Sequence, residues 1–101
     1  MGNKIEIMRT FRVRAKVIII DYSTMTMDYE TDSRLFLGSP VLSKYQIRKK
    51  YCTIFKEQLP ILEKALSEDE EVNLLVHRKA EFDKKGNLVR TWDILGSVRN
   101  Y

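Results

Sequence analysis

Basic residues gather in one part of this chain, between positions 33 and 56, where no acidic residue interrupts them. Lysine and arginine side chains at close spacing can neutralise phosphate groups, and an aromatic ring among them can stack on a base or sugar. The residues of this segment best suited to that chemistry are Lys44, Tyr45, Arg48, Lys49, Lys50 and Lys56. The next stretch, residues 57 to 71, is acidic and holds Lys64 as its single base. The chain therefore carries adjacent segments of opposite charge.

We expect most of this charge reversal to lie on one helix. Ser43 and Gln46 have the spacing of a capping box, and an apolar stripe then repeats with helical period from about residue 44 to residue 66. Pro60 falls opposite the stripe and predicts a kink, because the stripe keeps its phase across it. The bases would occupy the N-terminal half, where the helix dipole favours acids. This inverted order favours a binding partner over a purely structural role for the charges.

Two kinds of partner fit a helix with this charge pattern. Nucleic acid, DNA or RNA, would be held through its phosphates without sequence specificity, because the chain has no recognised base-reading motif. The alternative is an acidic protein surface, which would make the chain an accessory protein or inhibitor, a class that includes viral proteins. Two antiparallel copies of the helix would also pair opposite charges in a homodimer.

A second basic cluster is expected at a turn near the C-terminus. Residues 83 to 87 predict a five-residue turn between two alternating segments, with Gly86 available for positive φ. Lys84 and Lys85 occupy the tip of this turn. We expect them to assist the basic helix in its contacts with phosphate or with an acidic partner.

The segments before the predicted helix alternate apolar and polar residues, which is typical of half-buried strands. Residues 11 to 19 form the first strand, and a turn at residues 21–23 leads to the second. The register pairs Lys16 with Asp28, Arg14 with Glu30 and Arg12 with Asp32. We therefore expect the acids to neutralise this basic face. The same register turns Ile18 and Ile20 outward, and the second strand is open to continuation through Leu35 and Leu37.

A second antiparallel hairpin is expected between residues 72 and 98. Its register places Arg78 opposite Trp92, a cation–π arrangement, and His77 opposite Asp93. No nucleophile has a suitable spacing to complete a catalytic triad with His77 and Asp93, so their pairing is interpreted as ionic. Cys52 is interpreted as a small packed residue.

The length of 101 residues and the hydrophobic fraction of 44% predict a single domain, residues 1–101, with one core. The predicted fold class is α+β. In chain order the predicted elements are a β-hairpin, an α-helix kinked at Pro60 and a second β-hairpin. They form a four-stranded antiparallel sheet with the helix on one face. A single cysteine excludes an internal disulfide and favours a reducing, cytoplasmic location. No apolar run is long enough to span a membrane.

These features predict a small, non-enzymatic binding module. One histidine and one cysteine do not make a zinc site, and no calcium loop, phosphate-binding loop or dinucleotide fingerprint is present. We expect no metal and no cofactor. Nucleic-acid binding by the basic helix is the leading hypothesis, with the protein-binding module or homodimer as the alternative.

Overall fold

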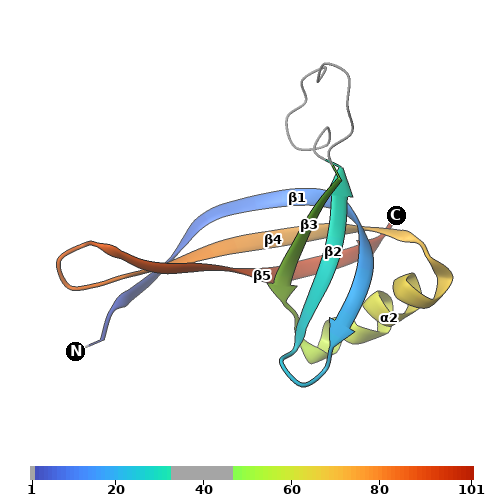
Figure 1. Ribbon diagram of the computed structural model, residues 1–101, viewed down its shortest axis with the longest axis horizontal. Helices are drawn as coiled ribbons and strands as arrows, with labels where there is room; N and C mark the ends of the chain where they lie inside the picture. The colour runs from blue at the N-terminus through green and yellow to red at the C-terminus, as the bar shows by residue number, and fades with distance from the viewer. Residues whose placement is uncertain (1, 33–46) are drawn as a thin grey trace, which may run out of the picture.

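The computed structural model describes residues 2–32 and 47–101, with the side chains of residues 32 and 47–49 left undescribed (Figure 1). Five strands, one short 3-10 helix and one α-helix make up this part of the chain. In chain order they are β1 (Lys4–Asp21), β2 (Thr26–Asp32), β3 (Ile47–Thr53), η1 (Lys56–Gln58), α2 (Leu59–Glu68), β4 (Glu71–Phe82) and β5 (Leu88–Asn100). The fold is α+β, as the sequence predicts.

The five strands form a closed barrel in the order β1-β2-β3-β5-β4. Four of the contacts between neighbouring strands are antiparallel, and β3 and β5 meet in parallel at Thr53 and Ile94. The predicted four-stranded antiparallel sheet is therefore wrong in strand number and in one direction. The additional strand, β3, comes from the segment that was predicted to be helical.

The inward face of β1 supplies much of the barrel core. Val13, Ala15 and Val17 are buried, and the bases between them point outward, as the alternation predicts. The register of β1 against β2 then shifts between Val17 and Ile19. This bulge reverses the faces that follow, so Ile19 is exposed and Ile20 is buried, contrary to the prediction that Ile20 points outward.

The turn between β1 and β2 sets a different register from the predicted one. Asp21 lies opposite Thr26, so the loop has four residues rather than three. The carboxylate of Asp21 accepts hydrogen bonds from the Ser23 backbone at 2.9 Å and the Ser23 hydroxyl at 2.6 Å, which stabilise this loop. As a result Lys16 faces Glu30 instead of Asp28. The predicted ladder of ion pairs is therefore displaced by two residues.

The predicted helix over residues 44–66 is confirmed only in its last part, where α2 begins at Leu59, and is wrong over residues 47–53. Residues 47–53 form strand β3, which pairs with β2 along its whole length, and the capping-box residues 43 and 46 lie outside the described residues, as do Leu35 and Leu37. Cys52 and Ile54 point into the core and Tyr51 points outward. Because the bases at 48–50 lie on a strand, the argument from an inverted helix dipole no longer applies. The antiparallel helix dimer loses its basis for the same reason.

The α-helix begins at Leu59, one residue before the proline that the sequence predicts to kink it. Pro60 occupies the first turn of α2, where its missing N–H costs nothing. Leu62 and Ala65 are buried, and the helix packs against β1 and β5. Gln58 fixes the approach to the helix, because its side-chain amide donates to the Leu95 carbonyl at 2.9 Å and its carbonyl accepts from the Phe55 backbone at 2.9 Å.

The second hairpin forms as predicted, but its register slips by one residue. Phe82 lies opposite Leu88, and a bulge next to this pair places Arg78 opposite Asp93. The Arg78 guanidinium donates to both carboxylate oxygens of Asp93, at 2.8 Å and 3.1 Å. The expected pairs of Arg78 with Trp92 and of His77 with Asp93 are therefore wrong.

One end of the sheet projects from the barrel as an arm (Figure 1). We define the arm as the first part of β1, the last part of β4 and the first part of β5, which pair with one another from Lys4 to Arg9 and around the β4–β5 turn. The radius of gyration is 15.1 Å, whereas a compact domain of this length has a radius of about 13 Å. The arm contributes to this large radius.

Candidate nucleic-acid interface

The predicted site residues whose side chains the structure describes, Lys50, Lys56, Lys84 and Lys85, lie in different parts of the fold. Lys44 and Tyr45 lie outside the described residues. The backbones of Arg48 and Lys49 lie in β3, opposite Thr31 and Glu30 of β2. Lys56 is exposed in η1, next to the helix, whereas the Lys84–Lys85 turn is the tip of the arm (Figure 1). Within the described residues, the predicted bases therefore do not form a single surface.

Lys50 is half-buried, and its ammonium nitrogen lies 5.5 Å from the centre of the Phe11 ring. The guanidinium groups of Arg9 and Arg78 lie 5.6 Å and 5.5 Å from the same ring. Cations at such distances are attracted to the ring face. Lys50 is thus held in an aromatic contact at the barrel and does not belong to an open basic surface.

Lys84 and Lys85 stand on a well-formed turn, as the sequence predicts. Asp83 accepts hydrogen bonds from the backbones of Asn87 and Lys85, both at 2.9 Å, and Gly86 adopts a φ of 83°. The Asn87 backbone bond is the main reason that the pKa of Asp83 is lowered. Both lysines are exposed at the tip of the arm.

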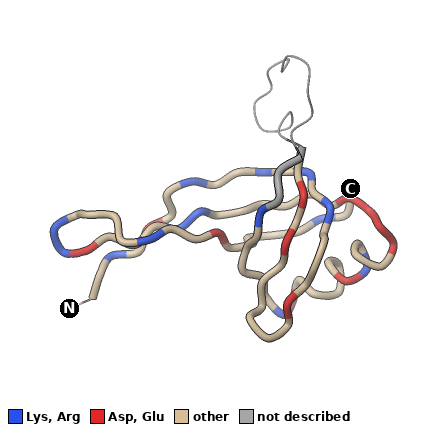
Figure 2. Tube along the Cα trace, viewed as in Figure 1, with Lys and Arg blue, Asp and Glu red and all other residues tan. Residues whose placement is uncertain are grey.

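The outward face of β2 is acidic. Asp28 is exposed and Glu30 is half-buried on this face, next to the exposed ring of Tyr51 on β3. Figure 2 shows acidic positions along β2 and at the connection between α2 and β4. Carboxylates repel phosphate, so this part of the barrel is poorly suited to a polyanion.

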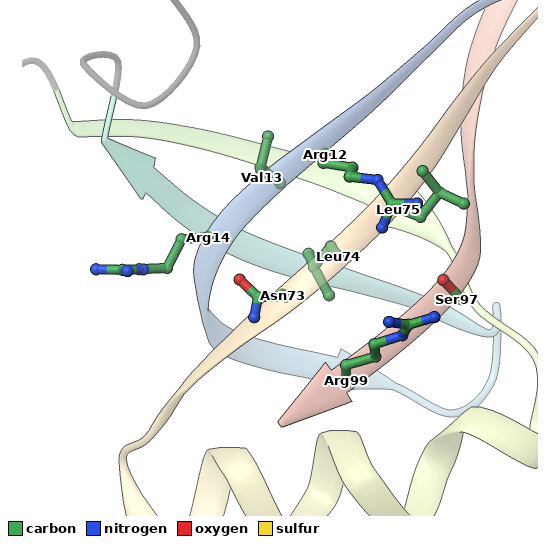
Figure 3. Close-up of a pocket in the computed structure, with 8 residues that line it drawn as sticks. All are labelled: Arg12, Val13, Arg14, Asn73, Leu74, Leu75, Ser97 and Arg99. Carbon is green, nitrogen blue, oxygen red and sulfur yellow. The ribbon is translucent and has the colours of Figure 1, made fainter. Parts of the chain in front are cut away.

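The outward face of β1, β4 and β5 has the opposite character. Two rows of paired residues cross these strands: Arg12, Leu75 and Ser97 form one row, and Arg14, Asn73 and Arg99 form the next. These six residues line a shallow groove with a volume of about 330 Å³, which we call the outer groove (Figure 3). Figure 3 shows Arg12 and Arg99 on the side of Leu75 and Ser97, and Arg14 pointing away from them.

Two of the three arginines in the outer groove are free to bind a ligand. Arg14 lies 3.6 Å from Glu71 and donates to the Tyr101 hydroxyl, so its charge is partly used within the chain. Arg12 and Arg99 have neither an ion pair nor a hydrogen bond with any side chain in the described part of the structure. A guanidinium group can hold two phosphate oxygens at once.

Aromatic rings flank these arginines on the same face. The Tyr101 ring lies under the Arg14 guanidinium, 3.7 Å from its centre. Trp92 on β5 lies opposite Lys79, which follows His77 by two positions on the outward face of β4. The guanidinium group of Arg90 lies 4.4 Å from the centre of the Trp92 ring. Aromatic rings beside a cationic groove can stack on successive bases. We call the outward face from Tyr101 to Trp92, including the outer groove, the outer strip.

Acid–base or nucleophilic chemistry finds little support among the described residues. His77 shares a hydrogen bond of 2.8 Å with the Thr10 hydroxyl and does not contact Asp93. Cys52 is fully buried, and burial followed by the nearby Asp93 charge raises the pKa of its thiol to about 12. It packs in the core, as the sequence predicts. A buried thiol that stays protonated is a poor nucleophile.

The outer groove contains residues for which the sequence does not predict a binding role. Arg12 and Arg14 were expected to be neutralised by β2, but Arg14 pairs with Glu71, and Lys16 pairs with Asp69 at 3.1 Å. These acids precede and begin β4, and Arg12 has no acidic partner among the side chains that the structure describes. The available signal was the triplet of outward bases on β1 together with Arg99 near the C-terminus.

No group of three or more histidine, cysteine, aspartate or glutamate residues in the described ranges is arranged to hold a metal ion. Among the described helices, none is long and apolar enough to cross a membrane. Comparisons of the chain with protein-family models, with curated proteins and with solved structures gave no match.

Proposed function

We propose that this chain is a non-enzymatic module that binds single-stranded nucleic acid along its outer strip. Arg12 and Arg99 would neutralise backbone phosphates, and the rings of Tyr101 and Trp92 would stack on bases. The observation that carries the proposal is that Arg12 and Arg99, which have no acidic partner in the described part of the chain, lie together in a groove on one sheet face. The basic residues of the tip, Lys84 and Lys85, would extend the contact beyond the groove.

The size of the outer strip fits this ligand. From residue 92 to residue 101, β5 and the chain end span about 30 Å at the usual rise of an extended strand. That length can accommodate several nucleotides, within the range of site sizes known for small single-strand-binding barrels. The strip has no protruding helix to enter a major groove, so a flexible strand with exposed bases fits it better than a duplex.

The barrel topology adds fold-level support. A five-stranded barrel with this strand order and a helix between its third and fourth strands is the arrangement of OB-folds, which bind oligonucleotides and oligosaccharides. Such an analogy concerns fold and does not establish function. OB-folds commonly use the face of strands 2 and 3, but that face carries Asp28 and Glu30 here. The proposal therefore places the ligand on β1, β4 and β5.

A titration at low salt tests the proposal. A labelled oligothymidine, an RNA oligonucleotide and a duplex of equal length would be followed by fluorescence anisotropy, together with the emission of Trp92, the single tryptophan. We expect tighter binding of the single strands, quenching of Trp92 and weakening with added salt. Absence of binding at low salt would refute the proposed function, and preferential binding of the duplex would refute the single-strand assignment.

A further inference from the structure

The arm leaves one edge of β1 without a neighbour. β1 pairs with β2 only from Ala15 to Asp21, while its opposite edge pairs with β4 from Lys4 onward. In the part of the chain that the structure describes, no strand pairs with the first edge between Lys4 and Thr10. Unpaired N–H and C=O groups along such an edge are a template for another strand.

The same segment exposes apolar side chains on the arm. Every residue from Lys4 to Thr10 is exposed, and Ile5, Ile7 and Met8 have 54%, 57% and 51% of their surface open to solvent. Ile5 and Ile7 lie on one face of the strand. Isolated exposed apolar residues are ordinary, but three close together on an open edge favour an interaction.

The charges of the segment make it complementary to itself. If two copies pair antiparallel with a two-fold axis at Ile5, Lys4 of each copy faces Glu6 of the other, and the two Ile5 side chains face each other. Ile7 then lies diagonally beside the other copy's Ile5, within reach in such a ladder. Within one chain Lys4 and Glu6 already attract each other, at 2.8 Å, so both charges lie on the face that this pairing requires.

We infer that the chain forms a two-fold homodimer by antiparallel pairing of the two β1 edges, centred on Ile5. The partner is a second copy of this chain, because one register satisfies both the charges and the apolar residues. The pairing would join two three-stranded arms into one continuous sheet. It does not depend on nucleic-acid binding, and it replaces the predicted helix dimer, whose helix is not present over residues 47–53.

Two complementary charge variants test this register. In Lys4→Glu both residues that meet across the axis are acidic, and in Glu6→Lys both are basic. Each variant alone would place like charges opposite each other twice, and we expect its dimerisation to weaken about tenfold or more. An equal mixture of the two variants restores opposite charges across the axis in a heterodimer. Neither variant keeps the intrachain pair, so that pair cannot explain a recovery.

Sedimentation equilibrium over a range of concentrations would provide the measurement, with a chain mass of 11.9 kDa as the monomer reference. We expect a wild-type mass that rises toward twice this value, weaker association of each variant and recovery in the mixture. Lys85→Glu, at the tip of the arm, serves as a charge control that leaves dimerisation unchanged. A wild-type mass of one chain at every concentration would overturn the inference. If both variants dimerised as strongly as the wild type, the register would be overturned.

Discussion

Arg12 and Arg99 of the outer groove, which have no partner in the described part of the chain, predict how nucleic-acid binding depends on salt. Each phosphate contact with a single strand contributes about 0.7 to the slope of the logarithm of the binding constant against the logarithm of salt concentration. Replacing Arg12 and Arg99 with glutamine removes two such contacts and should reduce the slope by about 1.4. Over a fourfold rise in salt, these two residues then account for about a sevenfold loss of affinity. Both side chains are exposed, so the fold should tolerate the change.

A matched control separates groove contacts from overall charge. Lys56→Gln with Lys64→Gln removes two charges from η1 and α2, which are not part of the outer strip, and leaves a net charge of +2, since the wild type has +4. Anisotropy titrations with a labelled oligothymidine at several salt concentrations would give the three slopes. We expect the control to keep a slope close to the wild-type value. Equal slopes for the wild type and the double arginine variant would refute the assignment of phosphate contacts to the groove.

Three further predictions concern stability and can be checked by urea unfolding. The Tyr29 hydroxyl is buried without a hydrogen-bond partner in the described structure, so Tyr29→Phe should stabilise the fold by about 1 kcal/mol, and a clear loss of stability would contradict this interpretation. Asp93→Asn breaks the partly buried pair with Arg78 and should cost about 2 kcal/mol, whereas an unchanged midpoint would mean that the pair contributes little. The pKa of Cys52 rises from 9.0 to about 12 on folding, so its contribution is complete below pH 9 and is lost between pH 9 and 12. Relative to Cys52→Ala, the wild type should therefore lose up to about 1.4 kcal/mol per pH unit in this window, and parallel pH profiles would exclude this effect.

The sequence predicts the strands whose alternation is regular and misses the one whose alternation is broken. The inward positions of an ordinary half-buried strand are apolar, but β3 turns Lys50 toward Phe11 and exposes Tyr51. These two exceptions let the segment fit a helical stripe. Its strand-favouring residues, such as Tyr51 and Thr53, and the proline at position 60, which suits a helix start, were the signals against one long helix.

The registers were predictable only where no bulge intervenes. A bulge after Val17 and another beside Phe82 each shift the pairing of their hairpins. A bulge depends on how two strands curve around a core, and the alternation of residues along one strand does not predict that curvature. The candidate site followed from these registers, because they decide which acids reach Arg12 and Arg14. The closure of the barrel also determines the candidate site, since it brings Arg99 beside these two arginines.

Backbone amide shifts in a two-dimensional NMR titration with a short oligothymidine would test the central claim most directly. A chain of 11.9 kDa is small enough for residue-level assignment even as a dimer. The proposal predicts that the largest shift changes fall on the outer strip, at Arg12, Ser97, Arg99 and Trp92. Changes confined to the acidic face of β2, around Asp28, would contradict it, and so would a spectrum that does not respond at low salt.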